Sequence, residues 1–396
     1  MKNNIIKCKG FKFSGVAAGL KKNNHNDLGL IFSETEATAA GVFTKNRVRA
    51  APVILDKERV KSGVAQAVIV NSGNANCCAG SRSMADSIAM ARCAADELNI
   101  SDERVLVAST GVIGQPLPVE KIAAAAPELI RSLKEDGIMD LATAIMTTDT
   151  VPKVVSRQAD IDGVPFTVVA VAKGAGMIRP DMATMLCFVC TDLKVSSNVL
   201  ARVLSPAVDQ SFNRITIDGD TSTNDSVLLL ANGRSGAEIL TADHERLFQE
   251  VLNDLLFELA KMIVRDGEGA TKLIEVVAKG ALSDADARRV AETVANSSLV
   301  KTAFFGEDAN WGRIIAAVGR AGVPVEPDRI DIYFDDVMMA QNGVSCGQAT
   351  EEPATRVLRK PEFTVTVDLN SGKGQATVFT CDFSVDYVKI NADYRS

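Results

Sequence analysis

The first third of the chain repeats one pattern of apolar and polar positions. Residues 65–70 (AQAVIV) form a continuous apolar run, followed by the polar loop NSGNAN and by residues 81–98, whose apolar positions recur at helical spacing. The same order returns in residues 104–109 (RVLVAS), the loop TGVIGQPLP and the helical segment 119–133. Continuous apolar runs are typical of buried strands and apolar positions every three or four residues of amphipathic helices. The pattern predicts an α/β fold, in which the loops after strand ends usually hold ligands.

The second half of the chain shows a different pattern. Residues 241–264 predict a long amphipathic helix with Thr241 as its N-cap, residues 271–280 a strand, and residues 283–306 a helix that begins with Ser and Asp. Further on, apolar and polar positions alternate between Gly and Asp turns, as in strands. The predicted strands are 329–336, 362–369, 375–384 and 387–391.

These patterns divide the chain into three expected segments. We expect an N-terminal α/β domain over 1–192, a middle α/β segment over 193–280 and a C-terminal α+β domain over 281–396. The 396 residues are 46% hydrophobic and 23% charged, which is enough apolar material for two or three domains with sizeable cores.

The net charge and the lengths of the apolar runs narrow the range of possible functions. The net charge is −7 and the basic residues are scattered, so the basic surface typical of a nucleic-acid-binding protein is not expected. The N-terminus MKNNIIKCKGFKFSG has no apolar core of a signal peptide, and no apolar run approaches the roughly 18 residues of a membrane span. We therefore expect a cytoplasmic enzyme that acts on small molecules and binds neither membrane nor nucleic acid.

Cysteine and histidine give little support to redox or metal chemistry. The eight cysteines show neither disulfide-framework density nor paired zinc spacing. Cys187 and Cys190 form a C-x-x-C motif, but in a strand they would point to opposite faces, so we expect buried thiols. The only histidines, His25 and His244, have no triad or ligand context, which disfavours Ser-His catalysis and a His-built metal site.

Glycine-rich loops do not indicate a nucleotide site either. GAG at 174–176 and GEG at 267–269 match neither a P-loop nor a dinucleotide fingerprint. Both are equally consistent with turns in which glycine adopts positive φ.

A threonine in the stretch AKGAGMIRPDMATMLCFVCTD offers a different chemistry. Thr184 is by itself an ordinary strand residue, but it follows the small Ala183, a Gly-Ala-Gly loop and Pro180. A hydroxyl in this setting can attack the carbonyl before it, and hydrolysis of the resulting ester frees the α-amino group of Thr184. An amine with a pKa of about 7.7–8.0 can then serve as base for its own hydroxyl, without a histidine.

Ten ordered blocks make the sequence similar to the ornithine acetyltransferase (glutamate N-acetyltransferase, ArgJ) family over essentially its whole length. The blocks are GVAAGLK, AAGVFTKNRVRAAPV, NSGNAN, STGVIGQPLP, IMTTDTVPK, KGAGMIRPDMATML, TIDGDTSTND, RDGEGATK, FGEDANWGRI and INADYRS. The resemblance implies the family's self-processing α/β sandwich with a C-terminal α+β unit. It also implies cleavage between Ala183 and Thr184, giving an α chain of residues 1–183 and a β chain of residues 184–396.

The resemblance assigns roles residue by residue. Thr184 would be the nucleophile that takes acetyl from N2-acetylornithine and passes it to glutamate in a ping-pong reaction of arginine biosynthesis, with Thr110 and Gly111 as the oxyanion hole. The substrate-contacting positions would be Thr147, Lys173, Thr184, Glu268, Asn391 and Ser396. A lysine suits the α-carboxylate of both substrates, and a glutamate or amide suits an amino group. The ending Tyr-Arg-Ser keeps a terminal hydroxyl but departs from the family's common Tyr-Thr-Thr.

The resemblance further implies an α2β2 heterotetramer with no metal and no bound cofactor. It leaves open whether acetyl-CoA is a second acetyl donor, and it assigns no role to the cysteines, Asp308 or Arg313. A self-activating amidohydrolase or aminopeptidase with the same N-terminal nucleophile is the alternative enzyme. An inactive binding or structural relative is a third reading, which the joint presence of the site residues disfavours.

Overall fold

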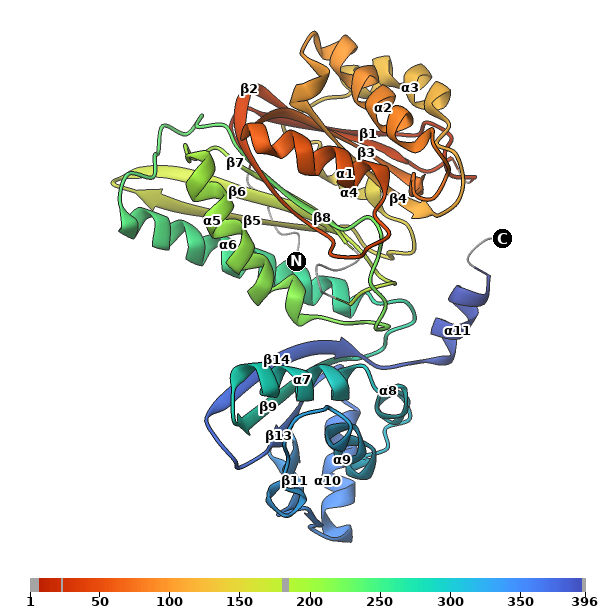
Figure 1. Cartoon of the computed structure of the whole chain (residues 1–396), viewed down its shortest axis with the longest axis vertical. Coiled ribbons are helices and arrows are strands. Elements are labelled where there is room, and N and C mark those ends of the chain that lie inside the picture. The colour runs from red at the N-terminus through yellow and green to blue at the C-terminus, as the bar shows by residue number, and fades with distance from the viewer. Residues whose placement is uncertain (1–6, 23, 180–184, 394–396) are drawn as a thin grey trace. The chain divides into compact units, whose positions relative to one another are not determined.

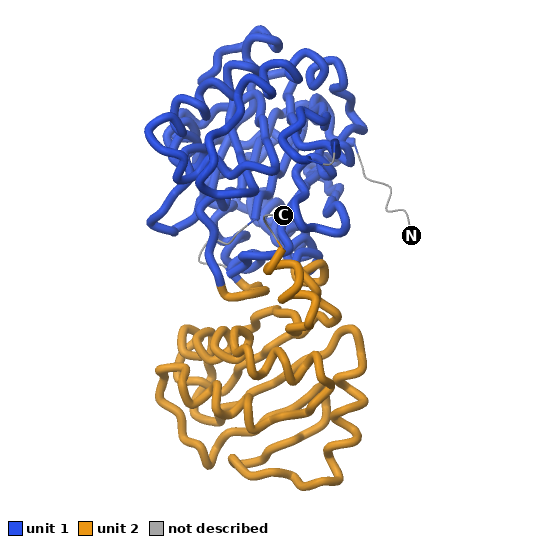
Figure 2. The backbone as a smooth tube through the Cα atoms, turned by 90° about the vertical axis from the view of Figure 1, so that its right-hand side faces the viewer, with its two compact units in different colours: residues 1–213, 220–263 blue, residues 214–219, 264–396 orange. Residues whose placement is uncertain are grey.

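The chain folds into two compact units (Figure 2). The computed structural model describes residues 7–22, 24–179 and 185–393. Unit 1 contains residues 1–213 and 220–263, and unit 2 contains residues 214–219 and 264–396.

Unit 1 is built on one eight-stranded sheet with the order β4-β3-β2-β8-β7-β6-β5, in which β1 pairs with β2 (Figure 1). Its strands are β1 (Phe11–Val16), β2 (Leu28–Phe43), β3 (Val64–Asn74), β4 (Val105–Val112), β5 (Lys153–Ile161), β6 (Val164–Lys173), β7 (Leu186–Thr191) and β8 (Ser226–Ala231). The pairs β3/β4 and β7/β8 are parallel and the other neighbours are antiparallel.

The long strand β2 turns this sheet into a sandwich. Its first half pairs with β1 and β3, its second half pairs with β8, and the register shifts between Phe32 and Ala37. As a result, Val68 of β3 and Leu106 of β4 share one buried cluster with Phe188 of β7. The two halves of the sheet therefore enclose a common apolar core, which confirms the predicted α/β sandwich.

Six α-helices of the described residues pack on the sheet of unit 1. They are α1 (Ala51–Arg59), α2 (Ser83–Leu98), α3 (Val119–Arg131), α4 (Ile138–Ile145), α5 (Ser197–Gln210) and α6 (Ala242–Arg265). Helix α4 lies in the core between the two halves of the sheet. Helices α2 and α3 bury Met90 and Ile122 against Ile69 and Val107, on the outer face of β3 and β4. On another part of the sheet, Phe248 of α6 meets Phe166 of β6 edge to face, with ring centroids 6.2 Å apart. The predicted cap of α6 is present, because the Thr241 hydroxyl accepts the His244 N–H.

Strand β7 shows why LCFVC belongs in the core. Every residue of β7 is buried, and it lies between β6 and β8. Cys190 joins the cluster of Phe188 while Cys187 points to the opposite face, as a period of two requires. Burial raises the pKa of both thiols, which keeps them in the neutral form that packs as an apolar side chain.

Unit 2 is a six-stranded sheet with the order β12-β11-β10-β13-β9-β14, packed against helices. Its strands are β9 (Leu273–Ala281), β10 (Asp331–Phe334), β11 (Val337–Gln341), β12 (Val344–Ser345), β13 (Glu362–Asp368) and β14 (Gly374–Cys381). Its helices are α7 (Asp284–Ala295), α8 (Ser298–Phe305), α9 (Trp311–Gly319), α10 (Glu351–Leu358) and α11 (Val385–Ala392). One apolar cluster joins β9 and β13 to α7, α8, α9 and α10.

Three details of the sequence prediction differ from the structure. Residues 387–391, predicted as a strand, lie in helix α11, which begins where the Ser384 hydroxyl accepts the Tyr387 N–H. The predicted helix 283–306 is two helices, because the first ends at Asn296 and the second begins after Ser297. The compact units also divide the chain elsewhere than at 192 and 280, since α5 packs on β2 and β8 and most of α6 belongs to unit 1.

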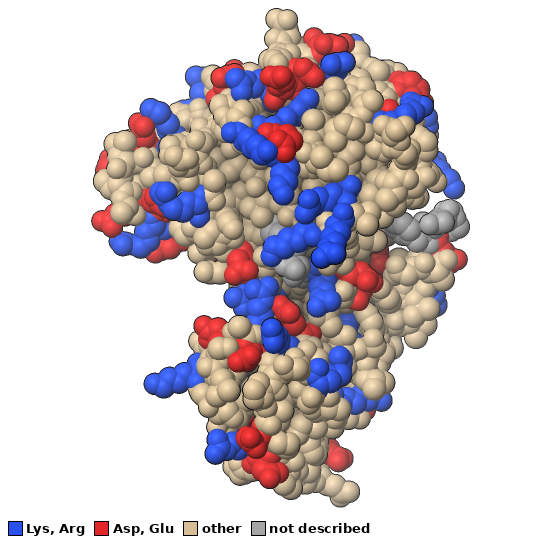
Figure 3. Space-filling model, viewed as in Figure 1, with Lys and Arg blue, Asp and Glu red and all other residues tan. Residues whose placement is uncertain are grey.

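The surface of the molecule carries side chains of both charges. On the face shown in Figure 3, Lys and Arg side chains occur together with Asp and Glu side chains on each unit. None of the helices in the described ranges has the length and hydropathy to cross a membrane.

Candidate active site

Thr110 and Gly111 lie at the carboxyl end of β4, where β4 runs parallel to β3. Both strands continue further than the sequence predicted, because their pairing extends through a bulge at Gly73 and Asn74. Gly111 has φ +129, and a Cβ there would collide with the backbone of Gly73 and lie 2.6 Å from the Asn74 nitrogen. Only glycine fits where the backbones of β3 and β4 approach each other so closely. The backbone at 110–111 is therefore held in one conformation.

Lys173, the last residue of β6, brings three of the predicted residues together. Its Nζ lies 2.9 Å from the Thr147 hydroxyl and 3.4 Å from the Thr110 hydroxyl. The side chain is only 6% exposed. A buried ammonium with hydroxyl neighbours is well suited to bind a carboxylate or a polarised carbonyl oxygen.

A buried carboxylate that the sequence analysis did not single out balances this charge. Asp149 accepts from Lys153 Nζ at 2.7 Å and lies 3.9 Å from Lys173 Nζ, with both oxygens also accepting the N–H groups of Gly174 and Thr147. Burial alone would raise the pKa of Asp149, but the two ammonium groups and the hydrogen bonds outweigh it and lower the pKa to about 2. Asp149 is therefore ionised at neutral pH and fixes the end of β6.

Amide side chains brace the loops around Thr110. Asn224 donates to the carbonyls of Ala75 and Ser109, at 2.7 and 2.8 Å, and so ties the ends of β3 and β4 together. Asn71 accepts from the Ser109 hydroxyl at 2.6 Å. The predicted loop NSGNAN thus takes part in the hydrogen bonds that support the ends of β3 and β4.

Ala183 and Thr184 lie outside the described residues, but the hydrogen bonds of the next residue, Met185, are described. Met185 donates its N–H to the Asp225 carboxylate at 2.9 Å and accepts the Ser226 N–H at 3.1 Å. Leu186 then pairs with Lys173 of β6 and with Ser226 of β8. The chain therefore enters β7 directly beside the strand end that carries Lys173.

The remaining predicted residues belong to unit 2. Glu268 lies in the loop after α6, and its Oε2 accepts from Asn391 Nδ2 of α11 at 2.8 Å. Gly269 has φ +67, and a Cβ there would lie 2.5 Å from the Tyr387 nitrogen. This close approach, with the Ser384 hydroxyl donating to the Gly269 carbonyl, fixes α11 against the GEG loop. Ser396 lies outside the described residues.

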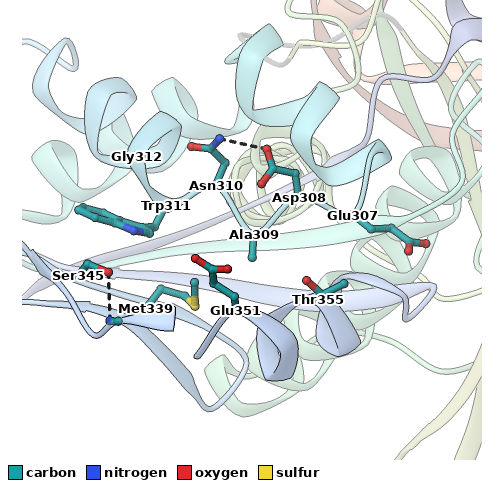
Figure 4. Close-up of a pocket in the computed structure, with 11 residues that line it drawn as sticks. Glu307, Asp308, Ala309, Asn310, Trp311, Gly312, Met339, Ser345, Glu351 and Thr355 are labelled. Atoms are coloured by element: carbon teal, nitrogen blue, oxygen red, sulfur yellow. Dashed lines mark hydrogen bonds between the residues drawn. The ribbon is translucent and has the colours of Figure 1, made fainter. Parts of the chain in front are cut away.

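The block FGEDANWGRI lines a separate hollow of about 540 Å³ within unit 2 (Figure 4). Trp311, Asp308 and Glu351 line it, and Asp308 accepts from the Asn310 side chain at 3.0 Å. Arg313 instead donates to the Leu299 carbonyl at 2.8 Å, which links α9 to α8. Arg313 therefore braces the fold.

Together, the sandwich and the buried Lys-Thr cluster at its strand ends define an α/β-sandwich enzyme with a small-molecule site. A family model described as the ArgJ family matches residues 12–396. The chain therefore belongs to the ArgJ family, which confirms the resemblance seen in the ten sequence blocks and, at the level of the family, the expected class of enzyme.

Relatives and a solved structure agree with this assignment. The arginine biosynthesis bifunctional protein ArgJ of Geobacter sulfurreducens is 55% identical over 390 residues, covering 98% of this chain and 99% of that protein. The protein of the same name from Syntrophotalea carbinolica is 52% identical over 394 residues, covering 99% of this chain and all of the other. The crystal structure of arginine biosynthesis bifunctional protein ArgJ from Bacillus halodurans matches with a TM-score of 0.50 and 43% identity, covering 52% of this chain and 97% of that chain.

Proposed function

We propose that this protein transfers the acetyl group of N2-acetylornithine to glutamate, giving ornithine and N-acetylglutamate, through an acetyl ester on Thr184. The observation that carries the proposal is the contact of Lys173 with Thr110 and Thr147 beside the start of β7, in a chain that matches the ArgJ family over residues 12–396. The arginine biosynthesis named for the relatives fits both substrates.

The proposed reaction begins with self-cleavage. The Thr184 hydroxyl adds to the Ala183 carbonyl, the peptide C–N bond breaks, and the freed nitrogen takes the proton. Water then hydrolyses the ester, leaving a carboxylate on Ala183 and a free amine on Thr184. The half-length match to the Bacillus halodurans chain supports a division near this point, because that chain matches 52% of this one while being covered almost completely.

Acetyl transfer then follows two equivalent steps. The Thr184 hydroxyl gives its proton to its own amine and attacks the acetyl carbonyl, and ornithine leaves with a proton. The glutamate α-amine attacks the ester in turn and regenerates Thr184. Thr110 and Gly111 are proposed to bind the oxyanion of each step, where the loss of one donor typically costs about 10²- to 10³-fold in rate.

Charges on both units suit the substrates. In this proposal Lys173 and Thr147 bind the α-carboxylate, and Glu268, oriented by Asn391, binds an amino group, with Ser396 as a further contact. Atoms and charges balance without a metal or a redox cofactor, so we propose that none is required. The relatives' name "bifunctional" supports acetyl-CoA as a second donor, and the two chains are proposed to assemble as α2β2.

The test combines intact-mass spectrometry with product analysis. Wild type is expected to appear as residues 1–183 and 184–396, and Thr184→Ala as one uncut chain without transfer activity. Thr191→Ala is the control, because it removes a buried hydroxyl at the other end of β7. With N2-acetylornithine as donor, ornithine release should depend on glutamate.

Two outcomes would contradict the proposal. Transfer activity in an uncut wild-type chain would eliminate the N-terminal threonine mechanism. Ornithine release at the same rate without glutamate would identify a hydrolase, the amidohydrolase or aminopeptidase alternative. Two further measurements test the second donor and the assembly. Turnover of acetyl-CoA in the presence of glutamate tests the second donor. A particle of twice the mass of the uncut chain is expected for the α2β2 assembly.

A further inference from the structure

Lys21 ends the block GVAAGLK, and the loop that carries it is tied to β3. The fully buried carboxylate of Asp27 accepts the N–H groups of Ala18, Leu20 and Lys21 at 2.6, 2.6 and 2.8 Å. The Asp27 carbonyl in turn accepts the N–H of Ser72 in β3 at 2.8 Å. The backbone of Lys21 is therefore fixed beside the end of β3.

The side chain of Lys21 lies against Gly73, where β3 pairs with the end of β4. Gly73 is the register partner of Gly111, and a Cβ added at Gly73 would be only 3.3 Å from the Cγ of Lys21. Gly73 has φ +94, a conformation that favours glycine, and its missing side chain leaves the space that Lys21 occupies. The aliphatic part of Lys21 thus packs beside the strand ends that carry Thr110 and Gly111.

The end of β3 also connects Lys21 with the other residues of the candidate site. Ser72 donates its hydroxyl to the Ala144 carbonyl near the end of α4, at 2.5 Å. Helix α4 leads into Thr147, whose hydroxyl accepts from Lys173. Lys21, on the loop between β1 and β2, and Lys173, on β6, therefore border the same group of strand and helix ends.

The half-buried ammonium group of Lys21 has one hydrogen bond and no ion pair among the residues that the structure describes. Its Nζ donates to the Asn26 carbonyl at 2.9 Å, which leaves two of its three hydrogens for other acceptors. Burial lowers the pKa of Lys21, the charge of Asp27 opposes this, and the charges of Lys173 and Asp149 also act on it. A carboxylate bound beside Lys21 would therefore be attracted by two ammonium groups at once.

The two substrates of the proposed function differ in charge at the end away from the α-carbon. N2-acetylornithine ends in an ammonium group, whereas glutamate ends in a second carboxylate. In the proposed function Lys173 and Thr147 bind the α-carboxylate and Glu268 binds an amino group, so none of the three is assigned to the second carboxylate. A carboxylate that leaves water without a partner is strongly unfavourable. Glutamate therefore requires one cation that N2-acetylornithine does not.

We propose that the Lys21 ammonium group binds the side-chain carboxylate of glutamate and so selects glutamate as the acetyl acceptor. This inference rests on the proposed function and adds the residue that distinguishes its two substrates. The ornithine ammonium gains nothing from Lys21, so the contribution of Lys21 belongs to the second half of the reaction alone. A site built to pair with one group rejects an analogue that lacks it, so glutamine should be a poor acceptor.

The experiment measures the two half-reactions separately in Lys21→Met. In a ping-pong reaction the kcat/KM of each substrate reports the half-reaction of that substrate. Because a charge-assisted hydrogen bond is lost, Lys21→Met is expected to lower kcat/KM for glutamate by about 10- to 100-fold. The kcat/KM for N2-acetylornithine and the extent of self-cleavage, measured by intact mass, should not change. The preference for glutamate over glutamine as acceptor should fall with kcat/KM for glutamate, since glutamine lacks the charge.

Three further variants separate substrate binding from a structural role. Lys22→Met removes the adjacent exposed charge and should change neither kcat/KM. Lys121→Met removes the hydrogen bond to the Gly19 carbonyl, 2.6 Å long, which braces the same loop, and should not change the ratio of the two kcat/KM values. Lys21→Arg keeps the charge and should retain more activity with glutamate than Lys21→Met.

Two results would overturn the inference and leave the proposed function intact. A fall of equal size in both kcat/KM values would identify Lys21 as a contact of the shared α-carboxylate or as a support of the loop. An unchanged kcat/KM for glutamate would remove Lys21 from the site. Lys21→Gln, with the same expected results, replaces Lys21→Met if that protein does not fold. A wild type without acetyl transfer would overturn the proposed function and this inference together.

Discussion

The two groups of candidate site residues are built in opposite ways. In unit 1, Thr110 and Lys173 lie at strand ends and Thr147 lies in the loop after α4, and buried partners such as Asp149 and Asn224 hold their backbone. In unit 2, Glu268 is oriented by Asn391 on α11, a helix of eight residues none of which is buried. The candidate residues of unit 1 are therefore held by buried partners, whereas Glu268 is held from a helix without buried residues.

Gly111→Ala should give the largest effect. The new Cβ would collide with the backbone of Gly73, at a φ that an L-residue rarely adopts. If Thr110 and Gly111 form the proposed oxyanion hole, we expect a loss of about 10²-fold or more in kcat/KM together with a lower Tm, because the backbone that carries the donors moves.

The matched control is Gly114→Ala, in the loop that directly follows β4. Its φ is +88, but a Cβ there meets no atom within 4 Å. It should therefore show backbone strain without the collision and keep most of its activity. Equal losses in the two variants would show that the loop requires flexibility at both glycines rather than a fixed backbone at 111.

Asp149→Asn should give the next largest effect, on stability. It removes the negative charge that Asp149 places beside the buried Lys153 and Lys173, and breaking a buried pair typically costs about 3–5 kcal/mol in the free energy of unfolding. Asp254→Asn, which removes an exposed partner of Arg157, should cost no more than about 1 kcal/mol. Urea denaturation of both variants compares a buried ion pair with an exposed one.

The pH dependence of stability gives a second test of the same group. The pKa of Asp149 is lowered to about 2 in the folded chain, below its ordinary value of 3.8, so its contribution is fully present above about pH 4 and is lost as the pH falls toward 2. The contribution is on the order of 2 kcal/mol. In Asp149→Asn this part of the acid transition should be missing.

Glu268→Gln should affect catalysis without affecting stability. If Glu268 binds a substrate amine, losing its charge should cost about 10- to 100-fold in kcat/KM, since hydrogen bonds to charged groups contribute about 1.5–3 kcal/mol. Glu292→Gln, which loses a partly exposed pair with Arg288 on α7, is the control. An unchanged kcat/KM for Glu268→Gln would remove this residue from the site.

Asn391→Ala should give the smallest effect. It removes the bond that orients Glu268 but leaves the carboxylate in place, so we expect KM to rise only a few-fold, roughly the value of one ordinary hydrogen bond. Lys389→Ala on the same helix, which loses only an exposed pair with Asp386, should leave KM unchanged. A loss as large as that of Glu268→Gln would show that α11 is as rigid a support as the strand ends.

The sequence predicted the core strands well because continuous apolar runs have few alternatives. Residues 65–70 lie in β3, and all of 104–109 except Arg104 lie in β4. The segments 81–98 and 119–133 contain α2 and α3. The prediction of a strand failed in α11, where the apolar positions of the sequence pattern are not the buried positions of the structure. In α11 the apolar side chains of Val388 and Ile390 are exposed, so their alternation with polar residues carried no information about a buried face. Ser384, a good N-cap before Asp386, was the available signal.

The candidate site was predicted through resemblance, and its supporting residues were not. Asp149 and Lys153 stand in the quoted block IMTTDTVPK, but only tertiary structure shows that their side chains are fully buried and paired. Asp225 likewise follows an ordinary polar loop in the sequence. Its partner, the Met185 N–H, lies 40 residues earlier in the chain and cannot be found from spacing.

The central position of β7 has a consequence for the association of the two pieces that cleavage before residue 184 would produce. Residues 184–396 supply β7 and β8, and both strands lie inside the sheet whose remaining strands come from residues 1–183. The two pieces would share hydrogen bonds along β6/β7 and β2/β8 and could not part without opening the sandwich. A cell that makes two versions of this protein would therefore not mix their halves: each molecule would keep the partner with which it was translated.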